Sequence, residues 1–246
     1  MKKLLCGGLF FLWALSPLTV VGAAATEPTP LTPYTATYST TAMGMKVRIK
    51  RQLVATDDGY TLTSNGSSMF AKIKESARFK LIGEQIQGID YGYHLKSVVR
   101  RRREVIFLPE DGVIKSLKKG DWTEHSWSAG VLDQLSQQEQ LRLDLKIAAQ
   151  ASDAPPDILQ FRVVDGARIK QRTLKFMGTE ALTTSEGDVQ TLHYQQVRSP
   201  EASRRSNVWI APSLDYLMVR TRHEEDDSTI EILLESLALE PSVVSR

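Results

Sequence analysis

Apolar and polar side chains alternate with a period of two along much of the 246-residue chain, as is typical of half-buried β-strands. Segment 45–50 reads MKVRIK and places its apolar and basic residues on opposite faces. Segments 76–82 and 159–164 behave similarly. Turn-forming residues stand near these segments, at Asp58-Gly59, Asn65-Gly66, Asp111-Gly112, Asp165-Gly166 and Glu186-Gly187-Asp188. The pattern predicts successive β-hairpins.

Residues 130–150 depart from this pattern and predict a helix. They read GVLDQLSQQEQLRLDLKIAAQ, which is rich in helix-forming residues and has no proline. Leu141, Leu145 and Ala148 recur at helical spacing, whereas alternate residues from Leu141 to Ile147 also fit a strand. Length and composition favour the helix. The segment SDAPPD that follows, residues 152–157, is the best linker candidate.

These patterns predict a mainly β fold. We expect a curled antiparallel sheet, as an open or half barrel or a sandwich-like form, with one helix around residues 130–150. Residues 26–246 are expected to form a single β-rich domain, with a candidate subdivision near residues 151–157 whose two halves share a sheet or core.

The N-terminus has the three parts of a secretory signal peptide. Lys2 and Lys3 precede the apolar run 9–15, and small residues follow up to Ala25. The apolar run is short for a membrane span, which needs about 20 residues, so cleavage is favoured over an uncleaved anchor. We expect residues 1–25 to be removed and the mature chain to begin at Thr26. Because no later run is long and apolar enough for a transmembrane segment, the mature chain is expected to be soluble.

The chain's single cysteine, Cys6, lies ahead of the apolar run and not at the cleavage point. A lipoprotein carries its acylated cysteine at that point, so the chain is not expected to be one. Removal of the signal peptide leaves a mature chain without thiols. Disulfides, thiolate metal ligands and a cysteine nucleophile are thereby excluded.

Four consecutive arginines, Arg100–Arg103, raise the question of nucleic-acid binding. The chain has 31 basic and 29 acidic residues, and loss of Lys2 and Lys3 leaves 29 of each. A dedicated nucleic-acid binder carries a basic excess, so no nucleic-acid partner is expected. The arginines also begin a strand pattern that continues to a turn at residues 109–112. We interpret them as the solvated part of that strand, and a selective anion site is the alternative.

Four stretches of the chain together resemble a known family. They are YTATY at residues 34–38, VLDQLS at 131–136, GTE at 178–180 and VWIAPSLDYL at 208–217. In this order they look like the bacterial envelope family called domain of unknown function 3108, over roughly residues 34–238. Met218 stands where that family usually has proline. The resemblance implies an exported, mainly antiparallel β domain in a Gram-negative-type envelope, hence the periplasm, and it implies no activity.

Catalytic, metal and cofactor motifs do not emerge from the sequence. There is no Gly-x-Ser-x-Gly elbow, no His-Glu-x-x-His and no glycine-rich phosphate loop. The four histidines are far apart in sequence and each reads better as an isolated residue. Asp133 and Ser136 have the spacing of an acid and a nucleophile on a helix, but a polar helix start explains them better. No catalytic residue, metal ligand or cofactor is predicted.

Trp209 and Tyr216 are the candidate ligand-binding residues. They flank a predicted strand end at Pro212, which cannot donate to a sheet ladder. Such a pair faces a ligand or, more often, closes the end of a β core. For these two aromatic residues, the core interpretation is favoured and the ligand interpretation stays open.

The function predicted from these features is non-enzymatic. A curled sheet with a helix in its mouth is a natural container, so we expect a periplasmic protein that binds an apolar, lipid-like or glycan envelope component or assists envelope assembly. The alternative is a hydrolase or modifying enzyme acting on an envelope polymer. A deep apolar cavity would favour the first, and converged carboxylates or histidines the second. The sequence does not indicate an oligomeric state.

Overall fold

A computed structural model describes residues 31–42, 44–69, 71–198, 203–226 and 228–240. The predicted signal peptide, residues 1–25, and the predicted mature start, Thr26, lie outside them. The elements are β1 Tyr34–Ala42, β2 Met45–Thr56, β3 Gly59–Ser67, β4 Lys72–Ile82, β5 Gln85–Lys96, β6 Arg101–Leu108, β7 Val113–Lys118, β8 Asp121–Ser126, β9 Val131–Leu132, α1 Ser136–Ala151, β10 Ile158–Asp165, β11 Arg168–Thr184, β12 Gly187–Gln196, β13 Arg204–Ala211, the 3-10 helix η1 Pro212–Leu214, β14 Leu217–Glu225 and β15 Ser228–Leu239.

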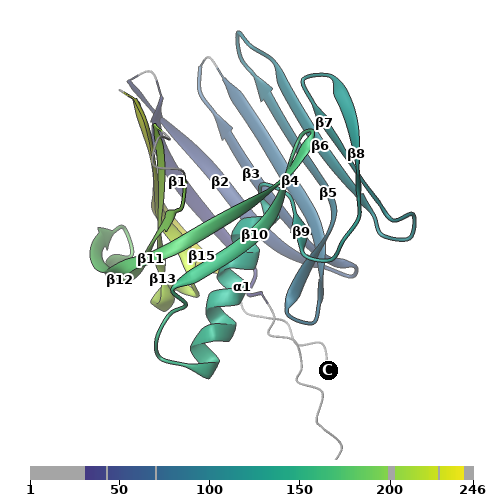
Figure 1. The fold of residues 1–246 in the computed structure, drawn as a ribbon. Coiled ribbons are helices and arrows are strands. Elements are labelled where there is room, and N and C mark those ends of the chain that lie inside the picture. The colour runs from purple at the N-terminus through teal and green to yellow at the C-terminus, as the bar shows by residue number, and fades with distance from the viewer. Residues whose placement is uncertain (1–30, 43, 70, 199–202, 227, 241–246) are drawn as a thin grey trace, which may run out of the picture.

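The described strands form one 15-stranded sheet in the order β8-β7-β6-β5-β4-β3-β2-β1-β15-β14-β13-β12-β11-β10-β9. Neighbours are antiparallel except β9 and β10, which are parallel. The sheet curls around a concave side, and α1 lies at one end of it (Figure 1). Its first and last strands do not pair, so the sheet is not closed into a barrel. The predicted mainly β, curled antiparallel fold with one helix is confirmed.

Side chains connect the two ends of the sheet where the backbone does not. On β7, the Ser116 hydroxyl donates to the Gly166 carbonyl over 2.7 Å, and His125 Nε2 on β8 donates to the same oxygen over 2.9 Å. Lys118 forms an ion pair with Asp165 beside them. We name these five residues the clasp. It brings β7 and β8 against the β10–β11 turn and narrows the opening of the curled sheet.

The helix begins at Ser136, six residues after the predicted start. Val131 and Leu132 form the short strand β9, which pairs with β10. The Asp133 carboxylate then accepts the backbone N–H groups of Leu135 and Ser136, each over 2.8 Å. Because the Asp133 side chain satisfies the backbone donors of this turn, residues 133–135 need not be helical. The helix therefore begins only at Ser136.

Most of the predicted turns join consecutive strands: Gly112 and Gly166 lie between strands, and Gly59 and Gly187 are the first residues of β3 and β12. The prediction for Asn65-Gly66 was wrong, because both residues lie inside β3. Gly66 is buried, and a Cβ there would come 3.1 Å from Ile49 Cγ1 on the neighbouring strand. The glycine therefore makes room for a cross-strand side chain and does not form a turn.

One hydrophobic core joins the parts of the chain before and after residues 152–157. Tyr34, Ala36 and Tyr38 on β1 are buried on the same face of the strand. They belong to one cluster of buried residues with Leu141 of α1 and Val163 of β10. The candidate linker thus connects two segments that share both the sheet and the core.

Candidate functional site

Helix α1 buries polar as well as apolar side chains inside the curled sheet. Gln137, Glu139, Gln140 and Arg142 are buried together with Leu141 and two further leucines. Buried polar groups are stable only when they find hydrogen-bond partners. The polar residues of the segment QQEQLR therefore identify the interior of the sheet as a hydrogen-bonded site.

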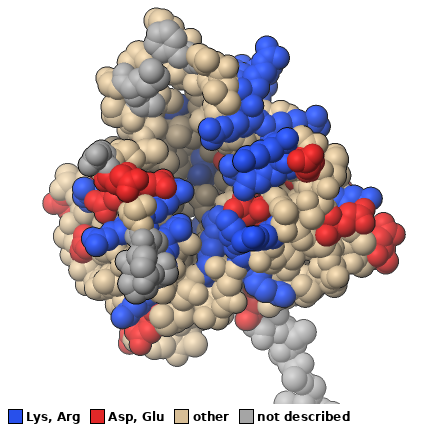
Figure 2. Space-filling model, turned by 45° about the horizontal axis from the view of Figure 1, so that its top comes forward, with Lys and Arg blue, Asp and Glu red and all other residues tan. Residues whose placement is uncertain are grey.

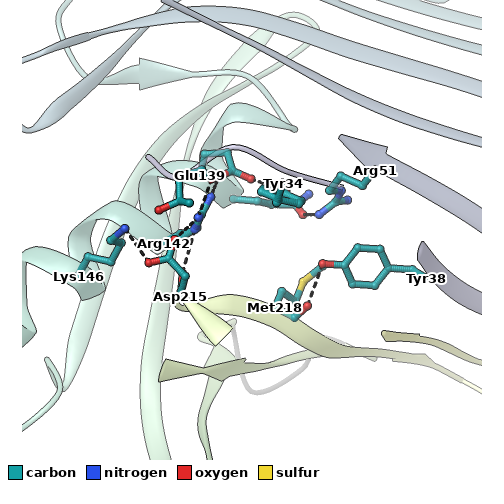
Figure 3. Close-up of polar contacts among 10 residues, drawn as sticks. Tyr34, Tyr38, Arg51, Glu139, Arg142, Lys146, Asp215 and Met218 are labelled. Carbon is teal, nitrogen blue, oxygen red and sulfur yellow. Dashed lines mark hydrogen bonds and ion pairs between the residues drawn. The ribbon is translucent and has the colours of Figure 1, made fainter. Parts of the chain in front are cut away.

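The deepest part of this site is an ionic network centred on Arg142 (Figure 3). Its Nη1 lies 3.0 Å from Glu139 Oε2, while the Tyr34 hydroxyl donates to Glu139 Oε1 over 2.7 Å. Arg142 also pairs with the Asp215 carboxylate, and its Nε donates to the Asp215 carbonyl over 2.9 Å. Lys146 Nζ lies 2.7 Å from the same carboxylate. The buried charges in this network thus have partners of opposite sign.

The backbone after η1 aims Asp215 at the helix. Asp215 and Tyr216 both adopt the left-handed conformation, with φ of 54° and 57°. This tight turn brings the carboxylate and the carbonyl of one residue to the same guanidinium. Burial acts to raise the pKa of the Asp215 carboxyl, but the charges of Arg142 and Lys146 outweigh burial and lower this pKa. The sequence SLDY thus serves to hold the Arg142 network.

Two further arginines are held by neutral side chains from the helix region. Arg51 Nη1 on β2 donates to Gln138 Oε1 over 2.6 Å. Arg172 Nη1 on β11 donates to Gln137 Oε1 over 2.7 Å, and its Nη2 donates to Gln134. An amide oxygen orients a guanidinium without cancelling its charge. Neither arginine forms an ion pair with a described acid, while Glu139 and Glu75 act on Arg51, and Asp165 on Arg172, through their charge.

These groups line a cavity of about 540 Å³ inside the sheet. Among the described lining residues, seven are basic and three acidic: Arg51, Arg103, Lys118, Arg142, Arg172, Arg198 and Arg204 against Glu75, Glu139 and Asp165. Figure 2 shows Lys and Arg side chains gathered around a hollow in this face of the molecule. The formal excess of positive charge makes the cavity attractive to anions.

The cavity also has an apolar wall. Val208 and Ile210 on β13, Leu217 and Met218 on β14 and Ile232 on β15 contribute to the lining. A cationic side and an aliphatic side therefore face the same space. This combination suits a ligand with an anionic part and an apolar part.

The structure separates the two candidate ligand-binding residues. Tyr216 lines the cavity, whereas Trp209 is not among the lining residues. Trp209 is 6% exposed and stacks on His193, with 4.4 Å between ring centroids. The Arg220 guanidinium lies over the indole ring, 4.6 Å from its centroid. The indole Nε1 donates to Glu180 Oε2 over 2.9 Å. Because Val208 and Ile210 both line the cavity, Trp209 between them projects from the other face of β13.

The arginine run divides between solvent and cavity. Arg101 and Arg102 are exposed, and Arg102 pairs with Glu104. Arg103 is half-buried, lines the cavity and lies over the Tyr93 ring at 5.7 Å. The solvated-strand interpretation thus describes most of the run, and its last member belongs to the basic lining.

Asp133 and Ser136 form a closed pair away from solvent. Both are fully buried, and the Ser136 hydroxyl donates to Asp133 Oδ2 over 2.7 Å. The same carboxylate holds the backbone turn before α1, as described above. This geometry supports the interpretation of the two residues as a polar helix start, since no substrate reaches a fully buried hydroxyl.

Burial raises the pKa of Asp133 to about 6, against hydrogen bonds from Ser136 and Leu135 that favour the ionised form. A carboxyl whose pKa is higher in the folded state stabilises the fold at low pH. This contribution, about 3 kcal/mol, is complete below about pH 4 and lost as the pH rises through 6. We expect wild type to lose this stability relative to Asp133→Asn between pH 4 and 7, as measured by urea unfolding. A difference between the two proteins that is constant over this range would contradict the assignment.

The described residues contain no group of three or more His, Cys, Asp or Glu placed to hold a metal ion. Their histidines have separate surroundings. His125 belongs to the clasp, His193 stacks on Trp209, and His223 lines the cavity. No helix among the described residues has the length and hydropathy of a membrane span.

Comparison with known proteins identifies the family. The family model described as "Protein of unknown function (DUF3108)" matches residues 33–235. The chain belongs to this family. The comparison with curated protein sequences gives no match. The predicted family is thus confirmed, and its motif around Asp215 coincides with the turn that holds Arg142.

A solved structure has a similar fold at low sequence identity. It is titled "Crystal Structure of Beta-barrel-like Protein of Domain of Unknown Function DUF1849 from Brucella abortus". The two chains share 13% identity with a TM-score of 0.54, and the match covers 87% of this chain and 100% of the other. At this identity the likeness concerns the fold alone.

The basic cavity itself was missed by reasoning from sequence. Its arginines lie on four different strands, on the helix and just after β12, so no local motif unites them. One local signal was present: Glu139, Arg142 and Lys146 follow helical spacing on a segment that was read for its leucines. Polar residues at i, i+3 and i+7 of a helix that must pack on a sheet indicate a buried polar network.

Proposed function

We propose that the chain is an exported, periplasmic protein that binds an anionic, lipid-like component of the cell envelope inside its curled sheet, without catalysing a reaction. The observation that carries the proposal is the cavity of about 540 Å³, with its basic excess on one side and its aliphatic wall on the other. This volume falls in the range of small-molecule sites, about 300–1,000 Å³. The signal-peptide pattern of residues 1–25 supports the proposed location.

The charges in the cavity refine the expectation of a purely apolar or glycan ligand. A guanidinium that only neutral groups hold gains energy from an anion, particularly where burial weakens competition from water. Arg51 fits this description, because its Nη1 donates to the neutral amide of Gln138 and its buried Nε donates to no described residue. Tyr216 and the aliphatic wall are then available to the apolar part of the ligand.

The proposal is tested by mass spectrometry of small molecules that co-purify with the protein from a periplasmic extract. Arg51 faces the cavity, whereas Arg48 on the same strand is exposed and pairs with Glu235 over 2.9 Å. We expect an anionic amphiphile to be enriched with wild type and with Arg48→Gln. Loss of a charged hydrogen bond should deplete it about tenfold with Arg51→Gln. Far-UV circular dichroism and a thermal melt verify that both variants are folded.

Two results would reject the proposed function. One is the absence of any enriched anionic amphiphile with the wild-type protein. The other is equal enrichment with a folded Arg51→Gln variant, because the ligand would then bind away from the cavity.

A further inference from the structure

Three arginines occupy neighbouring positions on the concave face of the sheet, one on β11, one just after the end of β12 and one on β13. Leu174 on β11 is opposite Gln196 on β12, and Arg172 and Arg198 each lie two residues beyond this pair. The Val197 N–H donates to the Thr173 carbonyl over 2.8 Å, so the two strands still run side by side there. Alternate residues of a strand share one face. The cavity is lined by both members of the pair, Leu174 and Gln196, and by both arginines. Arg172 and Arg198 are therefore cross-strand neighbours.

The third member of this arrangement is Arg204 on β13. It lies two residues before Ser206, which is opposite His223 on β14. Both Arg204 and Ser206 line the cavity, as does His223, whose Nδ1 lies 3.0 Å from the Ser206 hydroxyl oxygen. We name Arg172, Arg198 and Arg204 the arginine row. It passes from the half-buried Arg172 to the two exposed arginines at the edge of the cavity.

No described acid forms an ion pair with the arginine row. Arg172 is held by glutamine oxygens, and Arg198 Nη2 donates to Gln196 Oε1 over 2.9 Å. Asp165 lies near Arg172 but is already engaged by Lys118 and Lys170. Like charges on adjacent strands destabilise a sheet. Glu225 on β14 is opposite Arg204 and offsets part of the positive charge of the row. A bound anion would relieve the repulsion that remains.

The pKa of His223 reflects the positive charges placed around it. Burial lowers the pKa of His223, and the charges of Arg204, Arg198 and Arg172 lower it further. Burial likewise lowers the pKa of Arg172, with Arg198 and Arg204 acting in the same direction and Asp165 against them. The row and the histidine therefore share one positive field.

We propose that the arginine row, with His223 and Ser206, is a subsite for a phosphoryl group. This inference rests on the proposed function and specifies the anionic part of the ligand. A carboxylate offers two oxygens and one charge, which a single guanidinium satisfies. A phosphomonoester offers three acceptor oxygens and nearly two charges. Three guanidiniums and one further donor, from the hydrogen-bonded Ser206–His223 pair, match the larger acceptor and charge count at one end of the cavity.

The phosphoryl group has two chemical sources, a lipid headgroup and a water-soluble phosphate compound. Two probes distinguish them by isothermal titration calorimetry at physiological salt: dihexanoyl phosphatidic acid and inorganic pyrophosphate. We expect both to bind. If the lipid probe binds more tightly, the aliphatic wall contributes and the source is a lipid; equal or weaker binding assigns the subsite to a soluble phosphate. Either result supports the phosphoryl subsite.

Neighbouring residues on β13 supply a matched pair of variants. Arg204 lines the cavity, whereas Arg205 is exposed and opposite Glu224. We expect Arg204→Gln to weaken binding of phosphatidic acid about tenfold, as for loss of a charge-assisted contact. Arg205→Gln should leave binding within about twofold, since alternate residues of a strand point to opposite faces and Arg205 is not among the lining residues. Both arginines are exposed, so neither change should affect folding.

Other outcomes separate this inference from the proposed function. Dihexanoyl phosphatidylglycerol carries one negative charge on a phosphodiester, and hexanoate carries one on a carboxylate and has no phosphoryl group. Should they bind as tightly as phosphatidic acid and be insensitive to Arg204→Gln, the phosphoryl subsite is wrong while an anionic amphiphile site remains. Should none of the four probes bind the wild-type protein, the phosphoryl subsite is again wrong. The co-purification experiment then decides the proposed function by itself.

Discussion

Replacing Arg142 with methionine is expected to lower the free energy of unfolding by about 3–5 kcal/mol. Arg142 is 2% exposed and pairs with Glu139, which is equally buried, and with Asp215. Methionine fills much of the same space but leaves the buried Glu139 carboxylate without its ion-pair partner. Lys146 still pairs with Asp215, so the main cost falls on Glu139. Urea unfolding of wild type and variant measures the difference.

A double variant and an exposed pair provide the controls. Adding Glu139→Gln to Arg142→Met should recover part of the loss, because the uncompensated charge is removed while Tyr34 keeps an acceptor. Arg48 also pairs with a carboxylate, that of Glu235, but on the surface. Arg48→Met should cost less than about 1 kcal/mol. An Arg142→Met protein as stable as Arg48→Met would show that the buried network does not hold the fold.

Trp209→Ala is expected to cost about 3–5 kcal/mol, as for other buried tryptophans. The indole is packed between His193 and Arg220 from the two neighbouring strands, so alanine removes contacts on both sides of the ring. Its N–H also donates to Glu180. The variant should therefore melt well below wild type in a thermal scan. Binding by the remaining folded protein should not change, because Trp209 is not among the cavity lining.

Trp209→Phe separates the ring contacts from the hydrogen bond. Phenylalanine keeps an aromatic ring between the flanking side chains but cannot donate to Glu180. We expect this variant to lose about 1 kcal/mol, the net value of one hydrogen bond. If Trp209→Ala instead keeps the wild-type melting temperature and loses ligand binding, the residue acts on the ligand and not on packing.

The cavity also bears on the choice between a container and an enzyme. A container needs a lined interior space, and the described residues supply one with both charged and aliphatic walls. The buried Asp133–Ser136 pair, the best sequence candidate for acid and nucleophile, is closed to solvent and holds a backbone turn. These placements support binding over chemistry as the role that we propose.

Sequence alone determined the fold class and the family. The alternation of apolar and polar residues indicates which face of a strand is buried, and the turn pairs indicate where the backbone reverses. Both signals depend only on residues that are close in sequence. They were sufficient for a curled antiparallel sheet with one helix, and the motif VWIAPSLDYL supported the family. Local signals failed where a distant contact decided the structure. Gly66 accommodates Ile49 on another strand, and residues 131–132 pair with β10 in place of beginning the helix.

Only the tertiary structure decided the character of the interior. From sequence, Arg172 and Arg204 are isolated charges with no evident common role, and their neighbourhood depends on the register of strands far apart in the chain. The same holds for Arg142, whose partner Asp215 is brought to it by a left-handed turn 73 residues away. These charged side chains form a binding site only because separate segments of the chain place them around one cavity. That is why the sequence predicted a container, and the structure was needed to show that its lining is basic.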